Sequence, residues 1–555
     1  MSELFENHQA MLNSALVACG DRSYFSAFLE IPSGKIYGET AKADGEAWFK
    51  DRMNGAYALA GHPGAKGAAG KESSPFGPTL GVTYPKADVG TLISAAEAAA
   101  GAWGRAPIET RIGVCLEALV RINMQSFAMA NAVMHTTGQA FAMAFQAGGP
   151  HAQDRGLEAV AYAYQEMTRT PASALWTKPQ GKRDPLVMEK NFRVIPRGLS
   201  LVIGCATFPT WNTYPALFAS LACGNPVIIK PHPDAILPLA LTVEILRDVL
   251  TETGFDPNVV LLAVDEKGAE ITQEIATHPA IKTIDFTGSN GFARWLKDNV
   301  DRDTALYTEE AGVNSIVIAS SSQYRAMCDN IAFSISLYSG QMCTAPQNIY
   351  VPAGGIESDE GPKSFDAVAA DIGQAVDRLL SDPDRAAAIS GAIANPATVE
   401  RVKQAVSLGT VVRASTPVEG AGDARTATPL VMTIDDDASE AHKGECFGPV
   451  CFVVKAADAD SALKNASGLA REKGAITAAV YAQDEATLDR AVDAFAEAGV
   501  ALSCNLTGQI FVNQSAAFSD YHVSGANPAG NACLTDAAFV AGRFRIAPSR
   551  RLKAA

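Results

Sequence analysis

Short apolar segments alternate with longer segments of helical periodicity from residue 199 onward. Residues 199–203, 227–229 and 283–286 are strand candidates, and residues 211–223 and 235–250 between them carry apolar side chains at helical spacing. Successive strand–helix–strand units produce parallel strands with helices on both faces of one sheet. We therefore expect an α/β fold with its ligand site at the carboxyl ends of the strands.

The same alternation continues in the second half, and 555 residues exceed what a single core can organise. We expect strands at 315–319, 427–434 and 509–513, and helices at 323–338, 364–380 and 485–498.

The amino-terminal part is less regular. Helical spacing is visible at 4–19, 88–105 and 108–139, whereas 61–78 is rich in Gly, Ala, Ser and Pro and is typical of a surface loop. The stretch from Gly64 to Lys71 only partly matches a phosphate-binding loop, because Glu72 stands where Ser or Thr is required.

Composition excludes several classes of function. The net charge of −15 argues against nucleic acid or an anionic membrane as a partner. We also expect no membrane-spanning segment and no secretory signal. The ten cysteines are scattered, which predicts reduced thiols in a cytoplasmic protein, and no His/Cys cluster has metal-ligand spacing.

One cysteine stands at a predicted helix-to-strand junction. Cys343 lies in Gly-Gln-Met-Cys-Thr-Ala-Pro, where backbone N–H groups can lower a thiol pKa and solvate an oxyanion. A single cysteine is more often a small buried hydrophobe. Glu309, 34 residues upstream in Glu-Glu-Ala-Gly, supplies a candidate carboxylate base and favours the catalytic interpretation.

These two motifs, with three others in register, resemble the aldehyde dehydrogenase superfamily over roughly residues 85–545. The others are Lys230-Pro231 after a strand, Phe286-Thr287-Gly288-Ser289 opening a helix, and Glu445-Cys446-Phe447-Gly448-Pro449. The resemblance implies two doubly wound α/β domains plus a small oligomerisation hairpin and terminal strand.

The resemblance also implies roles for individual residues. Cys343 would attack an aldehyde as a thiolate, hydride would leave for a nicotinamide, and Glu309 would activate the water that hydrolyses the thioester. Lys230 would contact the adenosine ribose, and Gly288 and Ser289 the pyrophosphate. Glu445 would hold the nicotinamide ribose, and Phe447 would pack near the nicotinamide.

The oxyanion donor departs from the family pattern. Where the family has an asparagine in Trp-Asn-Phe-Pro, this chain has Thr207 in Ala-Thr-Phe-Pro, and Asn212 follows five residues later. We expect Thr207 to occupy the oxyanion position, with Asn212 as the alternative.

The adenosine site departs as well. Pro233 stands where the family has the glutamate that repels a 2′-phosphate, and Lys230 and His232 lie beside it. This substitution predicts NADP at least equal to NAD as the cofactor.

The resemblance divides the chain as follows: an amino-terminal extension at 1–80, a dinucleotide-binding domain at 81–182 and 198–308, a catalytic domain at 309–508, and oligomerisation elements at 183–197 and 509–555. A hairpin at 185–196 would join a homodimer or homotetramer. The loop Tyr521-His522-Val523-Ser524-Gly525 resembles a family loop that usually has lysine at the second position.

More narrowly, the segments around Thr207 and Glu309 resemble the aldehyde dehydrogenases of phenylacetate degradation. That resemblance implies a semialdehyde substrate, free or CoA-linked, from the opening of a CoA-activated aromatic ring. Two alternatives stay open: an aldehyde dehydrogenase that passes the acyl group to CoA, and a catalytically silent oligomeric relative.

Overall fold

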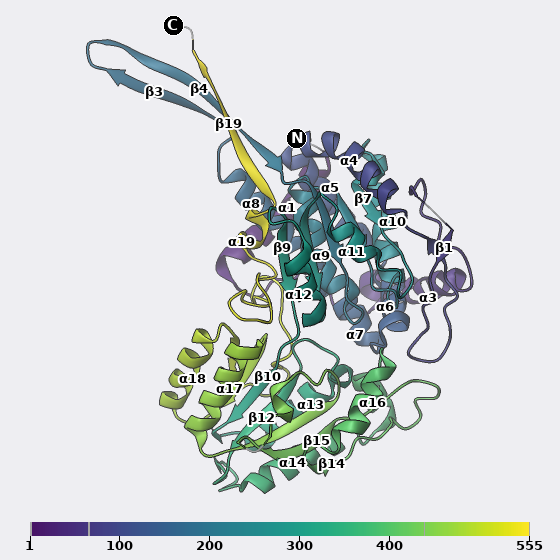
Figure 1. Cartoon of the computed structure of the whole chain (residues 1–555), viewed down its shortest axis with the longest axis vertical. Coiled ribbons are helices and arrows are strands. Elements are labelled where there is room, and N and C mark those ends of the chain that lie inside the picture. The colour runs from purple at the N-terminus through teal and green to yellow at the C-terminus, as the bar shows by residue number, and fades with distance from the viewer. Residues whose placement is uncertain (1–2, 65–66, 438, 554–555) are drawn as a thin grey trace.

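The computed structural model describes residues 3–64, 67–437 and 439–553. Two lobes, each built on its own sheet, lie one above the other, and a long antiparallel ribbon projects from the upper lobe (Figure 1). Within these described ranges, every helix is too short or too polar to cross a membrane.

The sheet of the upper lobe has five parallel strands in the order β7-β6-β5-β8-β9. Strands on both sides of β5 come later in sequence, as expected of a doubly wound fold. The strands are β5 (Leu199–Ile203), β6 (Val227–Lys230), β7 (Val260–Leu262), β8 (Ile281–Thr287) and β9 (Ala305–Glu309).

Apolar residues on both faces of these strands explain why helices cover both sides. Along β5, Leu201 packs with α4 (Val89–Arg105), whereas Val202 belongs to the core on the opposite face. Helices α11 (Ile271–Ala276) and α12 (Asn290–Asn299) share the first core. The second core includes α5 (Ile108–Met124), α8 (Pro150–Thr168), α9 (Pro209–Ala222) and α10 (Leu237–Glu252).

The amino-terminal helices pack directly on the upper lobe. Phe5 and Leu12 of α1 (Glu3–Asp21) are 2% and 0% exposed, and a Cβ at Gly113 would lie 2.7 Å from the Phe5 nitrogen. Glycine thus lets α1 approach α5 closely. The helical stretch expected at 108–139 is interrupted at Gln125, after which α6 (Ser126–Thr137) begins.

The lower lobe contains seven strands in the order β14-β15-β16-β12-β10-β17-β18, of which only the edge strand β14 is antiparallel to its neighbour. Ile316 and Val453 pack under α13 and α14, and Val317 and Phe452 pack against α17 and α18 on the other face. The bounds are β10 (Asn314–Ile318), α13 (Tyr324–Ser336), β12 (Pro346–Pro352), α14 (Phe365–Leu379), β14 (Thr410–Arg413), β15 (Leu430–Asp435), β16 (Val450–Ala456), α17 (Ala459–Lys473), β17 (Thr477–Tyr481), α18 (Glu485–Glu497) and β18 (Ala501–Cys504).

The projecting ribbon corrects one expectation. The hairpin expected at 185–196 is a single strand, β4 (Arg183–Pro196), which pairs with β3 (Ser173–Gln180) on one side and with β19 (Phe544–Leu552) on the other. Nearly every residue of β3 is exposed, so the ribbon lacks the one-sided burial that marks a strand of a packed sheet.

The strand expected at 509–513 is wrong, because this segment is irregular. The backbone oxygen of Asn513 accepts a hydrogen bond from Thr344 Oγ1, at 2.8 Å, instead of pairing with a strand. The remaining elements are α2 (Gly34–Tyr37), α3 (Ala41–Arg52), β1 (Ala68–Ala69), β2 (Tyr84–Pro85), α7 (Phe141–Gly148), η1 (Pro257–Val259), β11 (Ser320–Ser321), η2 (Leu337–Gly340), β13 (Glu357–Ser358), α15 (Pro383–Ser390), α16 (Pro396–Ala405), η3 (Ala441–Lys443) and α19 (Ala537–Ala541).

Candidate active site

The turn that carries Cys343 has an unusual backbone. Tyr338, Ser339 and Gly340 have positive φ angles of 50°, 50° and 63°, so three consecutive residues adopt a conformation that L side chains rarely occupy. A Cβ at residue 340 would lie 2.5 Å from the carbonyl oxygen of Gly448. The glycine of the cysteine motif is therefore required by contact with the Glu445–Pro449 motif.

Two amides hold the cysteine loop in place. Gln341 Nε2 donates to the carbonyls of Tyr338 and Ala392, both at 3.1 Å. Asn314 Nδ2 donates to the carbonyl of Cys343 at 2.8 Å, while its Oδ1 accepts from the backbone of Ile476 at 2.9 Å. These bonds tie the loop to β10 and β17, so Cys343 sits on a rigid support.

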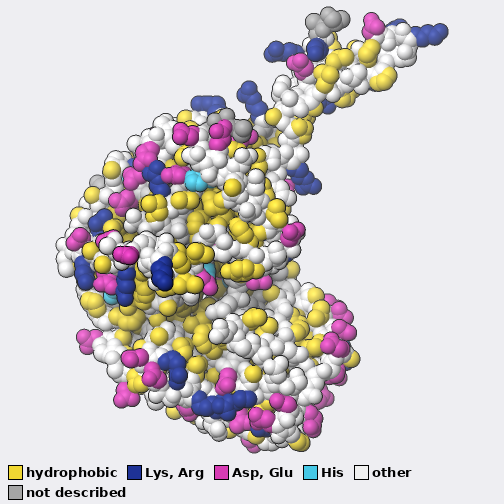
Figure 2. Space-filling view, turned by 180° about the vertical axis from the view of Figure 1, so that it is seen from behind, with side chains coloured by type: hydrophobic (Ala, Val, Ile, Leu, Met, Phe, Trp, Pro, Cys, Tyr) yellow, Lys and Arg dark blue, Asp and Glu magenta, His cyan; other side chains and the backbone are white. Residues whose placement is uncertain are grey.

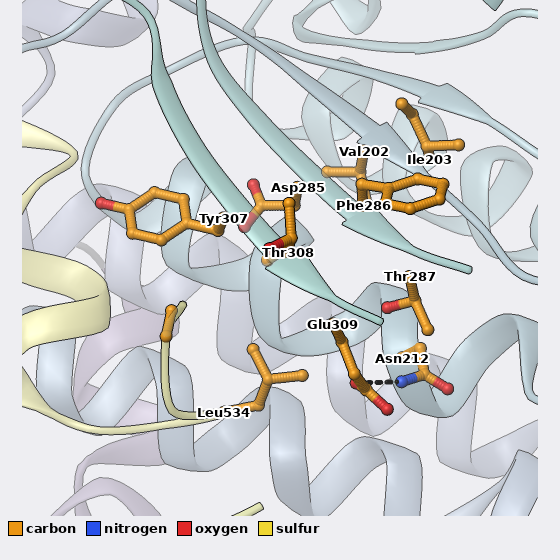
Figure 3. A pocket seen from close by; sticks show the side chains of 12 residues that line it. Val202, Ile203, Asn212, Asp285, Phe286, Thr287, Tyr307, Thr308, Glu309 and Leu534 are labelled. Atoms are coloured by element: carbon orange, nitrogen blue, oxygen red, sulfur yellow. Dashed lines mark hydrogen bonds between the residues drawn. The ribbon is translucent and has the colours of Figure 1, made fainter. Parts of the chain in front are cut away.

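Glu309 is the last residue of β9, and its carboxylate is 3% exposed. Its backbone oxygen accepts a hydrogen bond from Gly288 at 3.0 Å, which joins the ends of β8 and β9. Asn212 Nδ2 donates to Oε2 at 2.8 Å (Figure 3), and His522 Nε2 lies 3.1 Å from Oε1. Both carboxylate oxygens therefore have partners.

His522 completes a cluster with the two residues that the sequence singled out. Its Nε2 lies 3.8 Å from Cys343 Sγ, and the potential ligand atoms of Glu309, Cys343 and His522 all lie within 4.8 Å of one another. These are metal-ligating residue types, although their spacing in the sequence predicts no metal site. Sequence reasoning missed His522 as a site residue; the replacement of the usual lysine at this position was the available indication.

The electrostatics of the pair follow from burial and proximity. Burial raises the pKa of the Cys343 thiol well above its ordinary value, and the neighbouring Glu309 carboxylate adds to the rise. Burial also raises the pKa of Glu309, but His522 and the hydrogen bonds to the carboxylate outweigh it, so the pKa is lowered overall. At neutral pH the resting pair is thus an ionised carboxylate next to a protonated thiol, so a base lies within reach of the thiol proton.

The structure separates the two oxyanion candidates. Asn212 contacts the Glu309 carboxylate, and its Oδ1 lies 3.5 Å from Cys205 Sγ. Thr207 lies beside the Cys205 thiol, and burial raises the pKa of that thiol to about 11. Asn212 therefore contacts Glu309 directly, whereas Thr207 lies beside Cys205, which in turn contacts Asn212.

A small pocket opens beside Glu309 at the carboxyl end of the upper sheet (Figure 3). Its volume is about 20 Å³, which is enough for one water molecule. Val202, Asn212, Phe286, Thr287 and Leu534 are among the residues that line it. The space-filling view is indented between the two lobes, with hydrophobic side chains gathered beside the indentation (Figure 2).

The adenosine end differs from the sequence-based expectation. Lys230 Nζ lies 2.7 Å from Asp265 Oδ1, and both side chains are less than 10% exposed. A carboxylate therefore lies beside Lys230, although residue 233 is proline. Burial is also the main cause that lowers the pKa of His232, and Lys230 and Lys267 lower it further. A cationic pair at 230 and 232 is thus disfavoured.

The residues expected at the pyrophosphate and the nicotinamide lie on both lobes. Ser289 caps α12 by accepting from the Phe292 nitrogen, and the first turn of a helix presents N–H groups that favour an anion. Glu445 is exposed beside Gly312, and partial desolvation of its carboxylate raises the pKa to about 7. The Phe447 carbonyl accepts from Arg401 at 2.6 Å.

These features fit a dinucleotide. Asp265 Oδ1 is buried, and the Lys230 ammonium lies 2.7 Å from it. A carboxylate oxygen has a second lone pair, and ribose hydroxyls are donors that would use it. The roles of the cofactor residues stay predictions.

Comparisons with known proteins agree with this architecture. Residues 82–532 match the model of the aldehyde dehydrogenase family. A crystal structure of an NAD-dependent aldehyde dehydrogenase from Burkholderia multivorans is 51% identical, with a TM-score of 0.98 and full coverage of both chains. A Thermus 1-pyrroline-5-carboxylate dehydrogenase with bound NAD shares the fold, at 18% identity and a TM-score of 0.72, over 96% of this chain and 99% of that one.

Curated relatives are more distant. Aldehyde dehydrogenase LUC3 of a Fusarium species is 25% identical over 69% of this chain and 77% of its own length. Vanillin dehydrogenase of Corynebacterium glutamicum is 27% identical over 54% of this chain and 58% of its own length. The extent of the family match, with the arrangement of Cys343 and Glu309, leads to one conclusion: this chain belongs to the aldehyde dehydrogenase family, whose members oxidise the aldehyde group.

Proposed function

We propose that this chain oxidises an aldehyde to a carboxylic acid through a covalent intermediate on Cys343, with a nicotinamide dinucleotide as the acceptor. The observation that carries the proposal is the placement of the Cys343 thiol and the Glu309 carboxylate within 4.8 Å, both in reach of His522. A thiol next to a carboxylate that accepts its proton is an activated nucleophile.

The residues of the chain account for each step. Glu309 takes the thiol proton, and the Cys343 sulfur attacks the carbonyl carbon to form a thiohemiacetal. A nicotinamide, when bound, accepts the hydride that leaves this tetrahedral carbon. Glu309 releases the thiol proton to solvent and then deprotonates the water that attacks the thioester, and the Cys343 sulfur is the leaving group.

Water, rather than CoA, is the acyl acceptor in this proposal. Glu309 lines a pocket of about 20 Å³ that has room for one water molecule. An enzyme that passes the acyl group to CoA has no need for a base at this position. The test is product identification: free acid supports the proposal, and acyl-CoA formed in the presence of CoA would favour the alternative.

We propose a semialdehyde of aromatic catabolism, free or CoA-linked, as the substrate class. The motifs around Thr207 and Glu309 support this class by their resemblance to the enzymes of phenylacetate degradation. The test is a screen of aromatic, aliphatic and CoA-linked aldehydes by NAD and NADP reduction. A catalytically silent protein would reduce neither cofactor with any of them, and its Cys343 would resist thiol reagents that label other cysteines.

We propose NAD rather than NADP as the preferred cofactor, since Asp265 supplies the carboxylate that residue 233 lacks. The NAD-dependent description of the Burkholderia multivorans structure supports this choice. Replacing Asp265 by asparagine should raise affinity for NADP relative to NAD by about 10- to 100-fold, because a like charge facing the 2′-phosphate is removed. Dissociation constants of both cofactors, measured by protein fluorescence, check this expectation.

Glu266→Gln is the matched control, because Glu266 is the neighbouring acid and forms only an exposed ion pair with Lys71. Glu266→Gln should leave the ratio of the dissociation constants for NAD and NADP unchanged. A wild-type enzyme that binds NADP as tightly as NAD would contradict the assignment of Asp265.

We propose Asn212, in preference to Thr207, as the side-chain donor to the oxyanion. Its amide has a second N–H besides the one donated to Glu309. Asn212→Ala should lower kcat by about 10²- to 10³-fold, as the loss of one oxyanion donor does. Thr207→Ala should change kcat only slightly. Steady-state kinetics of both variants measure the two losses. A larger loss of kcat in Thr207→Ala than in Asn212→Ala would assign the oxyanion donor to Thr207.

We propose that the ribbon of β3, β4 and β19 joins copies of the chain into a dimer or tetramer. Leu175, Leu186 and Leu552 on it are 62%, 41% and 68% exposed. Leu175→Arg should weaken association by about tenfold or more, because an apolar anchor is replaced by a charge. Sedimentation velocity measures the outcome. Leu408→Arg on the lower lobe, where Leu408 is 40% exposed, is the control and should leave assembly intact.

A further inference from the structure

The His522 side chain is held rigidly in the site. Its backbone N–H and C=O pair with Leu534 at 3.3 and 2.8 Å, and its ring meets the edge of Trp211 with centroids 4.5 Å apart. The side chain is only 2% exposed. The paired backbone and the packed ring therefore keep Nε2 between Glu309 and Cys343, and a small tilt of the ring is enough to turn its N–H from one to the other.

The hydrogen-bond pattern indicates where the proton of this ring lies. Nε2 faces the Glu309 carboxylate at 3.1 Å, and an ionised carboxylate can only accept, so Nε2 carries a hydrogen. Nδ1 is buried and has no partner among the described residues. The geometry therefore places an N–H of this ring at Nε2, between the carboxylate and the sulfur.

The sulfur needs such a donor. The carboxylates of Glu309 and Glu445 both disfavour a thiolate at Cys343. Beyond His522, Arg155 lies over the Trp211 ring at 5.4 Å and is paired with Glu158. Among these groups, His522 is the one that can donate a hydrogen bond to the sulfur.

We propose that His522 is a catalytic hydrogen-bond donor, whose Nε2–H shifts from the Glu309 carboxylate to the Cys343 sulfur as the thiol ionises. In this step the S–H bond breaks, an O–H bond forms on Glu309, and the N–H bond of His522 stays intact. Glu309 then releases that proton to solvent before it activates water. The assignment rests on the proposed function and specifies how its thiolate is stabilised.

Two substitutions separate donation from other roles. His522→Gln retains an N–H donor at about the distance of Nε2 but cannot titrate, and His522→Leu removes the donor at similar volume. The measurement is the rate at which iodoacetamide alkylates Cys343 as a function of pH, followed by mass spectrometry of the peptide that carries it. EDTA is present, so that a metal ion on the same three side chains does not contribute.

The leucine variant should react about 10- to 100-fold more slowly at neutral pH, with its profile displaced to higher pH, because a hydrogen bond to a charged group is lost. The glutamine variant should retain most of the wild-type rate, and kcat should follow the same order while KM changes little. Melting temperatures and assembly state should match wild type in both variants.

Three results would overturn the inference. A leucine variant with wild-type alkylation would show that His522 does not affect the thiolate. A glutamine variant as slow as leucine would mean that the ring titrates instead of donating. A glutamine variant with normal alkylation but the same kcat loss as leucine would place the role of His522 after thiolate formation. Alkylation needs neither aldehyde nor cofactor. Each of these results would therefore overturn the role of His522 without deciding whether the chain oxidises aldehydes.

Discussion

Replacing Cys343 by alanine should reduce aldehyde oxidation by about 10⁴-fold or more, since loss of the nucleophile removes the covalent route altogether. Cofactor binding should be unchanged, because the residues assigned to the dinucleotide lie on other elements. Initial rates of NAD reduction and a fluorescence titration with NAD measure the two quantities. The expected pattern is normal binding with no turnover.

Cys504→Ala is the control, because Cys504 on β18 is another partly exposed thiol of the lower lobe. It should retain full activity. If Cys343→Ala still oxidised aldehydes at an appreciable rate, the thiol would not be the nucleophile, and the proposed reaction would have to be abandoned.

Replacing Glu309 by glutamine should separate the two halves of the reaction. Hydrolysis of the thioester needs a base, and its loss typically costs about 10²- to 10⁴-fold. Hydride transfer should be slowed less, because the first step needs only a thiolate, which alkaline pH also supplies. Stopped-flow traces should then show a burst of NADH near one equivalent per site, followed by very slow turnover.

Glu310→Gln is the control for Glu309→Gln. Glu310 is the adjacent residue, but its carboxylate pairs with Lys297 and Thr308 outside the cluster. It should show ordinary turnover with no burst. A Glu309→Gln enzyme that turned over like wild type would assign the base to another group.

Periodicity predicted much of the fold. The alternation of apolar strands with helices was sufficient for both α/β lobes, because segments such as 199–203 are apolar on both faces and must be covered by helices. Strands without one-sided burial were harder to predict from the sequence. Residues 173–180 of the projecting ribbon are almost wholly exposed, and the segment at 509–513 uses side chains to satisfy its backbone groups.

The site could be predicted only where a short motif marks it. Cys343 and Glu309 lie in such motifs, and the structure brings their side chains together. Asp265 lies outside such motifs, and the tertiary fold brings it to Lys230 from the segment after β7. His522 lies in a loop that resembles a family motif, but histidine replaces the usual lysine there, and its contact with Cys343 joins residues 179 positions apart. Contacts of this kind are absent from any local pattern.

The most direct test of the central claim is to locate the covalent intermediate. Glu309→Gln enzyme is mixed with NAD and an aldehyde that supports turnover, quenched in acid, digested and examined by mass spectrometry. The account predicts an acyl group on the peptide that carries Cys343, at near one equivalent per chain. An acyl group on Cys205 instead, or NADH formation with no adduct on any cysteine, would contradict it.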